Sequence, residues 1–296
     1  MNYNISIIIP HKNIPKLLER CLNSIPERED IQIIIVDDNS DEKYKNNFPG
    51  LARANTKVFF SDKSLTAGGA RNLGLSNAEG RFVMFADADD FFYTHFYKIV
   101  APFFDNDFDL VYFGMDSVDS VSLKPATRAN GIIKLLKKAS EGDIKSQEEV
   151  RYKFLYPSCK LIKRELINAH QIKFDEVPAS NDTMFGVKIG TFAENIIFSP
   201  KVIYCLTYRE NSLVTSYNYE NLKSRILVSL DLYKFLEERG KQLYSQSTIS
   251  HWFALRKVGY DKLLLNVPLL IKKYKWKAFL QDVKFAVFHR LKIIYK

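Results

Sequence analysis

The stretch RFVMFADADDFF (residues 81–92) predicts a buried β-strand that ends abruptly in three carboxylates. Its first half is almost entirely apolar, as in a strand that is covered on both faces of a sheet. Asp87, Asp89 and Asp90 follow at once. Three negative charges so close together repel one another unless water, a cation or basic side chains neutralise them. What neutralises these carboxylates is therefore the first question about function.

The residues before this stretch alternate between strand and helix patterns. Short runs of β-branched or aromatic residues predict strands at 5–9, 31–36 and 57–60. Apolar residues at helical spacing predict a helix after the first strand, capped by Asn13, and another at 67–78. Continuous apolar strands separated by helices indicate an α/β fold, with a mixed, mainly parallel sheet and helices on both faces.

Polar clusters follow three of these strands at their carboxyl ends, at residues 10–13, 37–40 and 87–90. The carboxyl ends of parallel strands meet at one edge of a sheet, where α/β proteins bind ligands. One acidic turn alone is more often a helix cap or a solvated loop, and Asp90 could be such a cap. Three clusters that converge on one edge favour a binding site.

Later patterns are sparser. Strands are predicted at 109–114 and 202–209, and helices from Asn221 onward. The three cysteines are scattered, which argues against a disulfide framework or a zinc site. No signal-peptide pattern and no apolar run long enough to span a bilayer is present, so we expect a cytoplasmic protein.

The formal net charge of +9 is concentrated at the C-terminal end. Residues 271–296 contain eight basic residues and one acidic residue, so they carry +7 of this charge. Apolar residues at a spacing of three and four predict an amphipathic helix there. Such a helix either lies on an anionic membrane surface, which would make the protein peripheral on the inner face of the cytoplasmic membrane, or packs on the rest of the protein.

The ordered set of motifs resembles glycosyltransferase family 2, whose members have the GT-A (nucleotide-diphospho-sugar transferase) fold. SIIIPHKN, IIIVDDNSDE, TAGGARNLGL and RFVMFADADDFF are similar to the donor half of that family, and PSCKLIKREL, NDTMF and YRENSLVTS extend the resemblance over residues 4–216. The chain looks most like inverting transferases that build bacterial capsular and surface polysaccharides. The resemblance implies a donor-binding half at 1–95, an acceptor-binding half of the same domain at 96–220, and a helical C-terminal region at 221–296.

The resemblance also implies roles for individual residues. The nucleotide-sugar would contact residues at the strand ends and on one helix: Pro10, His11, Asp38, Arg71, Asp87 and Ala88. Asp38 would accept a hydrogen bond from the base, typically uracil N3–H, and Asp87 would face the ribose. Asp89, together with Asp87, would hold Mn²⁺ or Mg²⁺ between the two phosphates, because hard divalent cations prefer oxygen ligands. The guanidinium of Arg71 could also offset the acidic edge.

The implied general base is Asp182, which would take the proton from the attacking hydroxyl. Direct displacement with one base predicts inversion at the anomeric carbon. Asn181 stands where the family usually has Glu, so the base lacks a neighbouring charge that would raise its pKa. Asp182 could also cap the helix predicted at 183–192. The implied donor is UDP-galactose or a UDP-N-acetylhexosamine, and the implied acceptor is a hydroxyl of a glycan or lipid-linked oligosaccharide.

Two other classes of protein fit less well. A nucleotidyltransferase of related fold would have a glycine-rich phosphate loop after the first strand, where this chain has PHKN. A non-catalytic protein that binds nucleic acid or membranes would present basic residues interleaved with aromatic ones, and only the tail offers these. We therefore expect a metal-dependent hexosyltransferase and no nucleic-acid partner.

Overall fold

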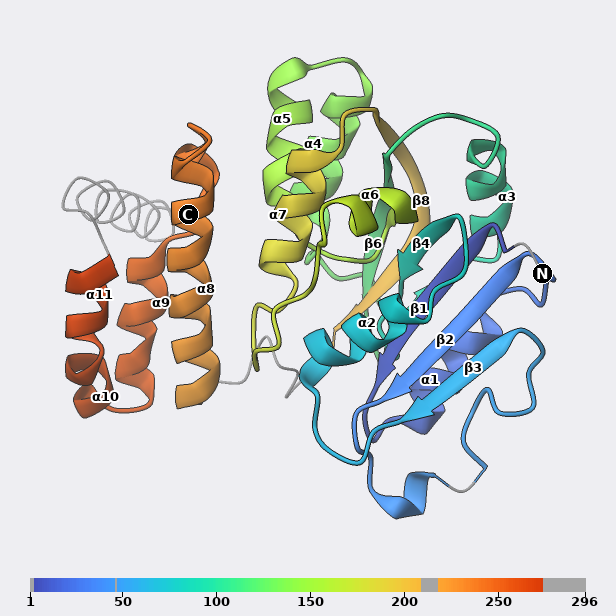
Figure 1. Ribbon diagram of the computed structural model, residues 1–296, viewed down its shortest axis with the longest axis horizontal. Helices are drawn as coiled ribbons and strands as arrows, with labels where there is room; N and C mark the ends of the chain where they lie inside the picture. The colour runs from blue at the N-terminus through green and yellow to red at the C-terminus, as the bar shows by residue number, and fades with distance from the viewer. Residues whose placement is uncertain (1–2, 46, 209–217, 274–296) are drawn as a thin grey trace. The chain divides into compact units, whose positions relative to one another are not determined.

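The computed structural model describes residues 3–45, 47–208 and 218–273 (Figure 1). The chain forms two compact units, Met1–Glu176 with Asp182–Glu210 and Val177–Asn181 with Asn211–Lys296. Each unit has its own hydrophobic core. The division into a donor half, an acceptor half and a C-terminal region stays a prediction.

The basic tail at 271–296 lies almost entirely outside the described residues. Its amphipathic helix and its membrane contact therefore stay predictions. Within the part of the chain that the structure describes, no helix combines the length and the apolar character needed to cross a bilayer.

An eight-stranded sheet forms the centre of the first unit, in the order β3-β2-β1-β4-β7-β6-β8-β5. The strands are β1 (Ile5–His11), β2 (Ile31–Asp37), β3 (Thr56–Phe60), β4 (Phe82–Phe85), β5 (Phe91–Phe92), β6 (Leu110–Asp119), β7 (Lys160–Lys163) and β8 (Ile196–Tyr208). The first four run parallel, as do β6 and β8, whereas β7 and β5 are antiparallel to their neighbours. The mixed, mainly parallel sheet confirms the predicted α/β class.

Helices cover the sheet: α1 (Pro15–Asn23), α2 (Thr66–Ser76), α3 (Phe96–Val100), α4 (Asn130–Ser140), α5 (Ile144–Lys153), α6 (Arg164–Ala169) and α7 (Thr183–Phe192). The chain moves outward from β1 to β2 through α1 and crosses back from β3 to β4 through α2. Because both crossovers between parallel strands are right-handed, the two helices cover opposite faces. Figure 1 shows α2 in front of the parallel strands and α1 behind them.

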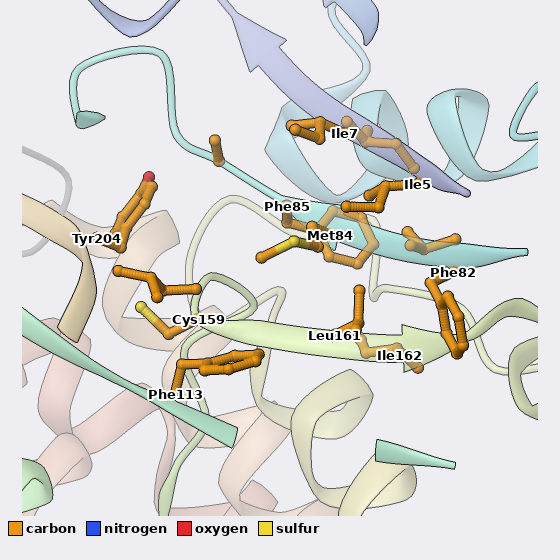
Figure 2. Close-up of a cluster of buried hydrophobic side chains, with 14 of the residues drawn as sticks. Ile5, Ile7, Phe82, Met84, Phe85, Phe113, Cys159, Leu161, Ile162 and Tyr204 are labelled. Carbon is orange, nitrogen blue, oxygen red and sulfur yellow. The ribbon is translucent and has the colours of Figure 1, made fainter. Parts of the chain in front are cut away.

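The core of the first unit lies where β1, β4 and β7 face the neighbouring helices. Figure 2 shows side chains from these strands packed together, among them Ile5, Ile7, Phe82, Met84, Phe85, Leu161 and Ile162. At Gly74 of α2 a Cβ would lie 2.4 Å from Cγ2 of Ile8, so only glycine lets the helix approach β1 this closely. Continuous apolar strands thus form because both sheet faces are buried.

Several details differ from the sequence-based expectations, among them that β6 continues to Asp119, five residues past the predicted strand. β7 was not predicted, because a strand of four residues that begins with Lys160 and ends with Lys163 shows no clear strand pattern. β8 begins at Ile196, six residues before the predicted strand. Asn13 does not cap α1: the cap position is Ile14, and Asn13 has a φ of +57° and accepts a hydrogen bond from Asp41 N–H instead.

In the second unit, the described residues from Tyr219 to Lys273 are mainly helical, as predicted from Asn221 onward. They are α8 (Tyr219–Glu237), α9 (Thr248–Ala254), α10 (Tyr260–Leu265) and α11 (Val267–Lys273). Their shared core contains Leu222, Ile226, Leu230, Leu255 and Leu270.

Candidate active site

The strand register brings the three polar clusters to one edge of the sheet. His11 pairs with Asp37 at the ends of β1 and β2. Phe85, at the end of β4, pairs with Ile8 of β1, so the carboxylates of residues 87–90 follow at the same edge. The predicted convergence is therefore present in the fold.

The turn after β2 is closed by its own hydrogen bonds. The buried carboxylate of Asp37 lies 2.7 Å from Nδ1 of His11 and accepts hydrogen bonds from the backbone N–H and the hydroxyl of Ser40. Nε2 of His11 accepts a hydrogen bond from Ile14 N–H, so Nδ1 is the protonated nitrogen that donates to Asp37. Burial would raise the pKa of Asp37, but these hydrogen bonds outweigh it and lower the pKa. Both ring nitrogens of His11 are thus occupied within the protein.

Asp38 follows β2 directly and is buried, with its carboxylate against the residues that precede α2. Its carboxylate accepts hydrogen bonds from Leu65 N–H and, at 3.3 Å, from the hydroxyl of Ser64. The ammonium of Lys12 lies 3.6 Å away. A carboxylate has about four lone-pair sites. These contacts therefore leave Asp38 capacity to accept a further hydrogen bond from a ligand.

Arg71 connects α2 to the acidic turn after β4. Its guanidinium forms an ion pair of 2.6 Å with Asp87 and lies 5.3 Å from the ring centre of Phe174. The Arg71 side chain is 7% exposed and that of Asp87 is 36% exposed. A basic side chain thus neutralises part of the acidic cluster, as the sequence predicted for Arg71.

The rest of this turn is held by β8 and α1. Asp90 is buried and accepts hydrogen bonds from Thr207 N–H at 2.6 Å and from the Tyr204 hydroxyl at 3.1 Å. The prediction that Asp90 caps the next helix is wrong, because its oxygens bond to β8. The backbone carbonyl of Asp89 accepts hydrogen bonds from Arg20 and from the Thr207 hydroxyl. Burial, followed by the charges of Asp87 and Asp89, raises the pKa of Asp90.

Asp182 precedes α7 at the cap position, but its side chain makes no capping hydrogen bond. Burial raises the pKa of this carboxyl above its usual range. The positive charges of Arg71 and Lys160 oppose the shift, and the negative charge of Asp87 adds to it. Asp182 therefore shares one electrostatic environment with the ion pair of Arg71 and Asp87.

Lys160 was missed in the sequence, although a lysine within the apolar run CKLI is a usable signal. The side chain is completely buried, and its ammonium donates hydrogen bonds to the carbonyls of Phe154, at 2.8 Å, and Tyr156. Burial lowers the pKa of Lys160 to about 7, while the charge of Asp182 opposes the shift. Cys159, directly before it, is buried with a φ of +63°, a rare backbone conformation for a residue other than glycine.

The two remaining predicted contacts also lie at this edge. Pro10 is the sixth residue of β1 and half-buried, and Ala88 is buried between the two carboxylates proposed for the cation. Among the described residues no three His, Cys, Asp or Glu side chains converge as a metal site. Asp87 and Asp89 therefore stay the predicted ligands of a cation.

An open groove of about 800 Å³ lies elsewhere, at the amino ends of β1 and β4. Its lining includes Asn4, Arg81, Lys163 and Glu165. None of the predicted site residues lines it.

Comparison with known proteins agrees with this geometry. Residues 6–170 match the family model described as Glycosyl transferase family 2. The match covers more than half of the sequence, so this chain belongs to glycosyltransferase family 2. The predicted family is confirmed.

Two curated relatives and one crystal structure are informative. The chain is 27% identical to the minor teichoic acid biosynthesis protein GgaB of Bacillus subtilis, over 95% of this chain and 30% of the relative. It is 27% identical to the poly(ribitol-phosphate) beta-N-acetylglucosaminyltransferase TarS of Staphylococcus aureus, over 71% of this chain and 37% of TarS. The chain thus spans about a third of the length of these relatives.

The crystal structure of S. aureus TarS 1–349 in complex with UDP-GlcNAc superposes on 96% of this chain and 79% of its own, with a TM-score of 0.61 and 22% identity. The likeness shows that the fold is the GT-A fold, as the motifs predicted.

Proposed function

We propose that this chain is an inverting glycosyltransferase that moves a sugar from a nucleoside diphosphate donor to a hydroxyl of a glycan or lipid-linked glycan in the synthesis of a bacterial surface polysaccharide. The observation that carries the proposal is the ion pair of Arg71 and Asp87, whose charges both act on the buried Asp182, at the strand-end edge where α/β folds bind ligands.

The donor would lie along the ends of β1, β2 and β4. Asp38 would accept a hydrogen bond from the base, since its carboxylate keeps lone pairs beyond those that bond Leu65 and Ser64. Pro10 and Ala88 would give apolar contact, and Asp87 would face the ribose. His11 would act by fixing the turn that carries Asp38, because both of its ring nitrogens are occupied.

The residues present fit a divalent cation. Mg²⁺ and related hard cations commonly take one or two carboxylates and complete their coordination with substrate phosphates and water. Asp87 and Asp89 supply that number, and the backbone of Asp89 is held on two sides by Arg20 and Thr207. When bound, Mn²⁺ or Mg²⁺ would stabilise the negative charge that develops on the departing diphosphate.

Asp182 would act as the general base. Its raised pKa makes the ionised carboxylate a better proton acceptor than an exposed one, provided that the pH keeps it ionised. Arg71 and Lys160 support this ionised form by their positive charge. Arg71 would also lie near the diphosphate, where a guanidinium suits phosphate oxygens. A single base and a direct displacement lead to inversion.

Among the two donors that the motifs imply, a UDP-N-acetylhexosamine is the first to test. TarS is described as a beta-N-acetylglucosaminyltransferase, and its structure was solved with UDP-GlcNAc. GgaB is described as a teichoic acid biosynthesis protein, which supports an acceptor at the cell surface. UDP-galactose is the alternative donor.

Calorimetric binding of UDP, GDP and dTDP, with and without Mn²⁺, tests this function. We expect only UDP to bind and Mn²⁺ to strengthen its binding. Asp89→Ala should abolish the effect of Mn²⁺, whereas Asp105→Ala, at an exposed carboxylate distant in sequence from the turn, should bind as the wild type does. A panel of UDP-sugars then identifies the donor by turnover. Absence of metal-dependent binding for every nucleotide would refute the proposal.

A further inference from the structure

Tyr204 of β8 links the two ends of the acidic turn. Its hydroxyl accepts a hydrogen bond of 2.9 Å from Asp87 N–H and donates one of 3.1 Å to the carboxylate of Asp90. A tyrosine hydroxyl has one hydrogen to donate and can accept at its oxygen, so both bonds form at once. Figure 2 shows Tyr204 beside the chain that leaves β4. One oxygen atom therefore ties the backbone of Asp87 to the buried end of the turn.

The position of Tyr204 is fixed independently of these bonds. The side chain is completely buried, and its ring packs edge to face on Phe92, with 5.0 Å between the two ring centres. Tyr204 also pairs with Phe92 in the antiparallel ladder of β5 and β8. Because its ring and backbone are both held, the hydroxyl can serve as a rigid anchor for the turn.

Thr207, three residues further along β8, holds the middle of the same turn. Its hydroxyl donates to the carbonyl of Asp89 at 2.6 Å, and its N–H donates to Asp90 at 2.6 Å. A single strand, more than a hundred residues away in sequence, thus contacts three consecutive parts of the turn through two residues.

Such anchors matter because Asp87 and Asp89 repel each other before any ligand binds. A turn held only by its internal bond, from Asp90 N–H to Asp87 O at 3.0 Å, could relax and separate the two carboxylates. Mutating a residue that hydrogen-bonds a metal ligand typically lowers metal affinity or activity by about 10–100-fold.

We propose that Tyr204 is a positioning residue whose hydroxyl presets Asp87 and Asp89 for the cation and the diphosphate of the donor. The inference rests on the proposed function, since it assigns both carboxylates to that site. It adds a residue that itself touches neither the nucleotide-sugar nor the metal.

Tyr112 offers a matched control. It is also completely buried in the first unit, and its ring stacks on Phe198. Among the described residues its hydroxyl has no hydrogen-bond partner. Tyr112→Phe therefore makes the same chemical change as Tyr204→Phe in a similarly buried place, without breaking a bond to the turn.

The test compares the wild type, Tyr204→Phe and Tyr112→Phe by calorimetric binding of UDP with Mn²⁺ and by backbone hydrogen exchange. We expect Tyr204→Phe to weaken binding of UDP with Mn²⁺ by about 10–100-fold and binding of UDP alone by much less. Exchange of the Asp87 amide should become faster in the same variant without any metal. Tyr112→Phe should change neither quantity.

Each outcome decides. Faster exchange at Asp87 with unchanged Mn²⁺-dependent binding would overturn the inference, as would equal effects of the two variants. If the wild type itself binds no UDP with Mn²⁺, the proposed function fails first and takes the inference with it. Should Tyr204→Phe not fold, Thr207→Val removes the hydroxyl that holds Asp89, and it must weaken the same Mn²⁺-dependent binding.

Discussion

The turns after β2 and β4 are both acidic, yet they are built differently. In the first, Asp37 is held by Ser40 of its own turn and by His11 of the adjacent strand. In the second, Asp90 is held by Tyr204 and Thr207 of β8, far away in sequence. Each turn thus has one buried carboxylate that holds the fold, Asp37 or Asp90. In the first turn Asp38 keeps lone pairs for a ligand, and in the second Asp87 is partly exposed. Position in a turn, and not charge alone, separates structural carboxylates from those proposed for chemistry.

Asp182 provides the strongest test of this distinction, because it makes no capping bond although it stands at a cap position. Asp182→Asn keeps the size of the side chain but removes the proton acceptor. We expect kcat to fall by about 10²–10⁴-fold while UDP binding stays within twofold. Steady-state kinetics and calorimetry measure the two quantities.

Asp175, a half-buried carboxylate seven residues earlier in the sequence, serves as the control, and Asp175→Asn should leave kcat nearly unchanged. If Asp182→Asn retained wild-type turnover, the general base would have to be another residue.

Asp37→Asn should show the opposite pattern. An asparagine keeps one oxygen but loses the charge that faces His11 and Ser40, so buried groups lose a strong partner. We expect the free energy of unfolding to fall by about 2–3 kcal/mol, within the range for losing hydrogen bonds to a charged group, with kcat of the folded fraction changed less than tenfold. Urea denaturation measures the first quantity.

The matched variant is Asp38→Asn, in the same turn. It should lose less stability than Asp37→Asn but weaken UDP binding more. The comparison of the two turns would be wrong if Asp38 proved the more important residue for stability.

The position of these carboxylates in the fold could be predicted from the sequence, because strand ends are a local feature. Apolar runs locate β1, β2 and β4, and the residues that follow them must lie at one edge of a parallel sheet. A role of Arg71 in offsetting the acidic edge could be predicted too, since close negative charges require a nearby cation, but its pairing with Asp87 in particular could not.

The anchors of the site could not be predicted in this way. Tyr204 and Thr207 reach the turn only because β8 lies beside β5, and Lys160 is buried only because β7 inserts between β4 and β6. Both placements depend on pairing between strands far apart in the sequence, which a period of apolar residues does not specify. A lysine at the first position of β7 also interrupts the apolar pattern by which a strand is predicted.

Lys160 allows the same question, structural or chemical role, to be asked of a buried basic side chain. Burial lowers its pKa to about 7, well below the pKa of a lysine in an unfolded chain. When the pH lies between these two pKa values, the unfolded chain binds more protons than the folded protein does. The free energy of unfolding should therefore rise with pH above 7. Relative to Lys160→Met, we expect the wild type to gain roughly 2 kcal/mol between pH 7 and pH 9.

Urea denaturation of both proteins at the two pH values measures this gain. Lys163→Met is the control, because Lys163 lies on the same strand with 24% of its side chain exposed. Parallel stability curves for the wild type and Lys160→Met would mean that the buried ammonium keeps an ordinary pKa.

The smallest expected effect connects Lys160 to the proposed base. The positive charge of Lys160 lowers the pKa of Asp182, against the burial that raises it. Lys160→Met removes this charge, so the pKa of Asp182 should rise. The acid limb of kcat/KM reports the base of the free enzyme, and we expect it to move to higher pH by about 0.5–1 unit. The pH dependence of kcat/KM for Lys163→Met should match the wild type. If the acid limb of Lys160→Met stayed in place or moved to lower pH, Lys160 would have no effect on the proposed base and would be a purely structural charge.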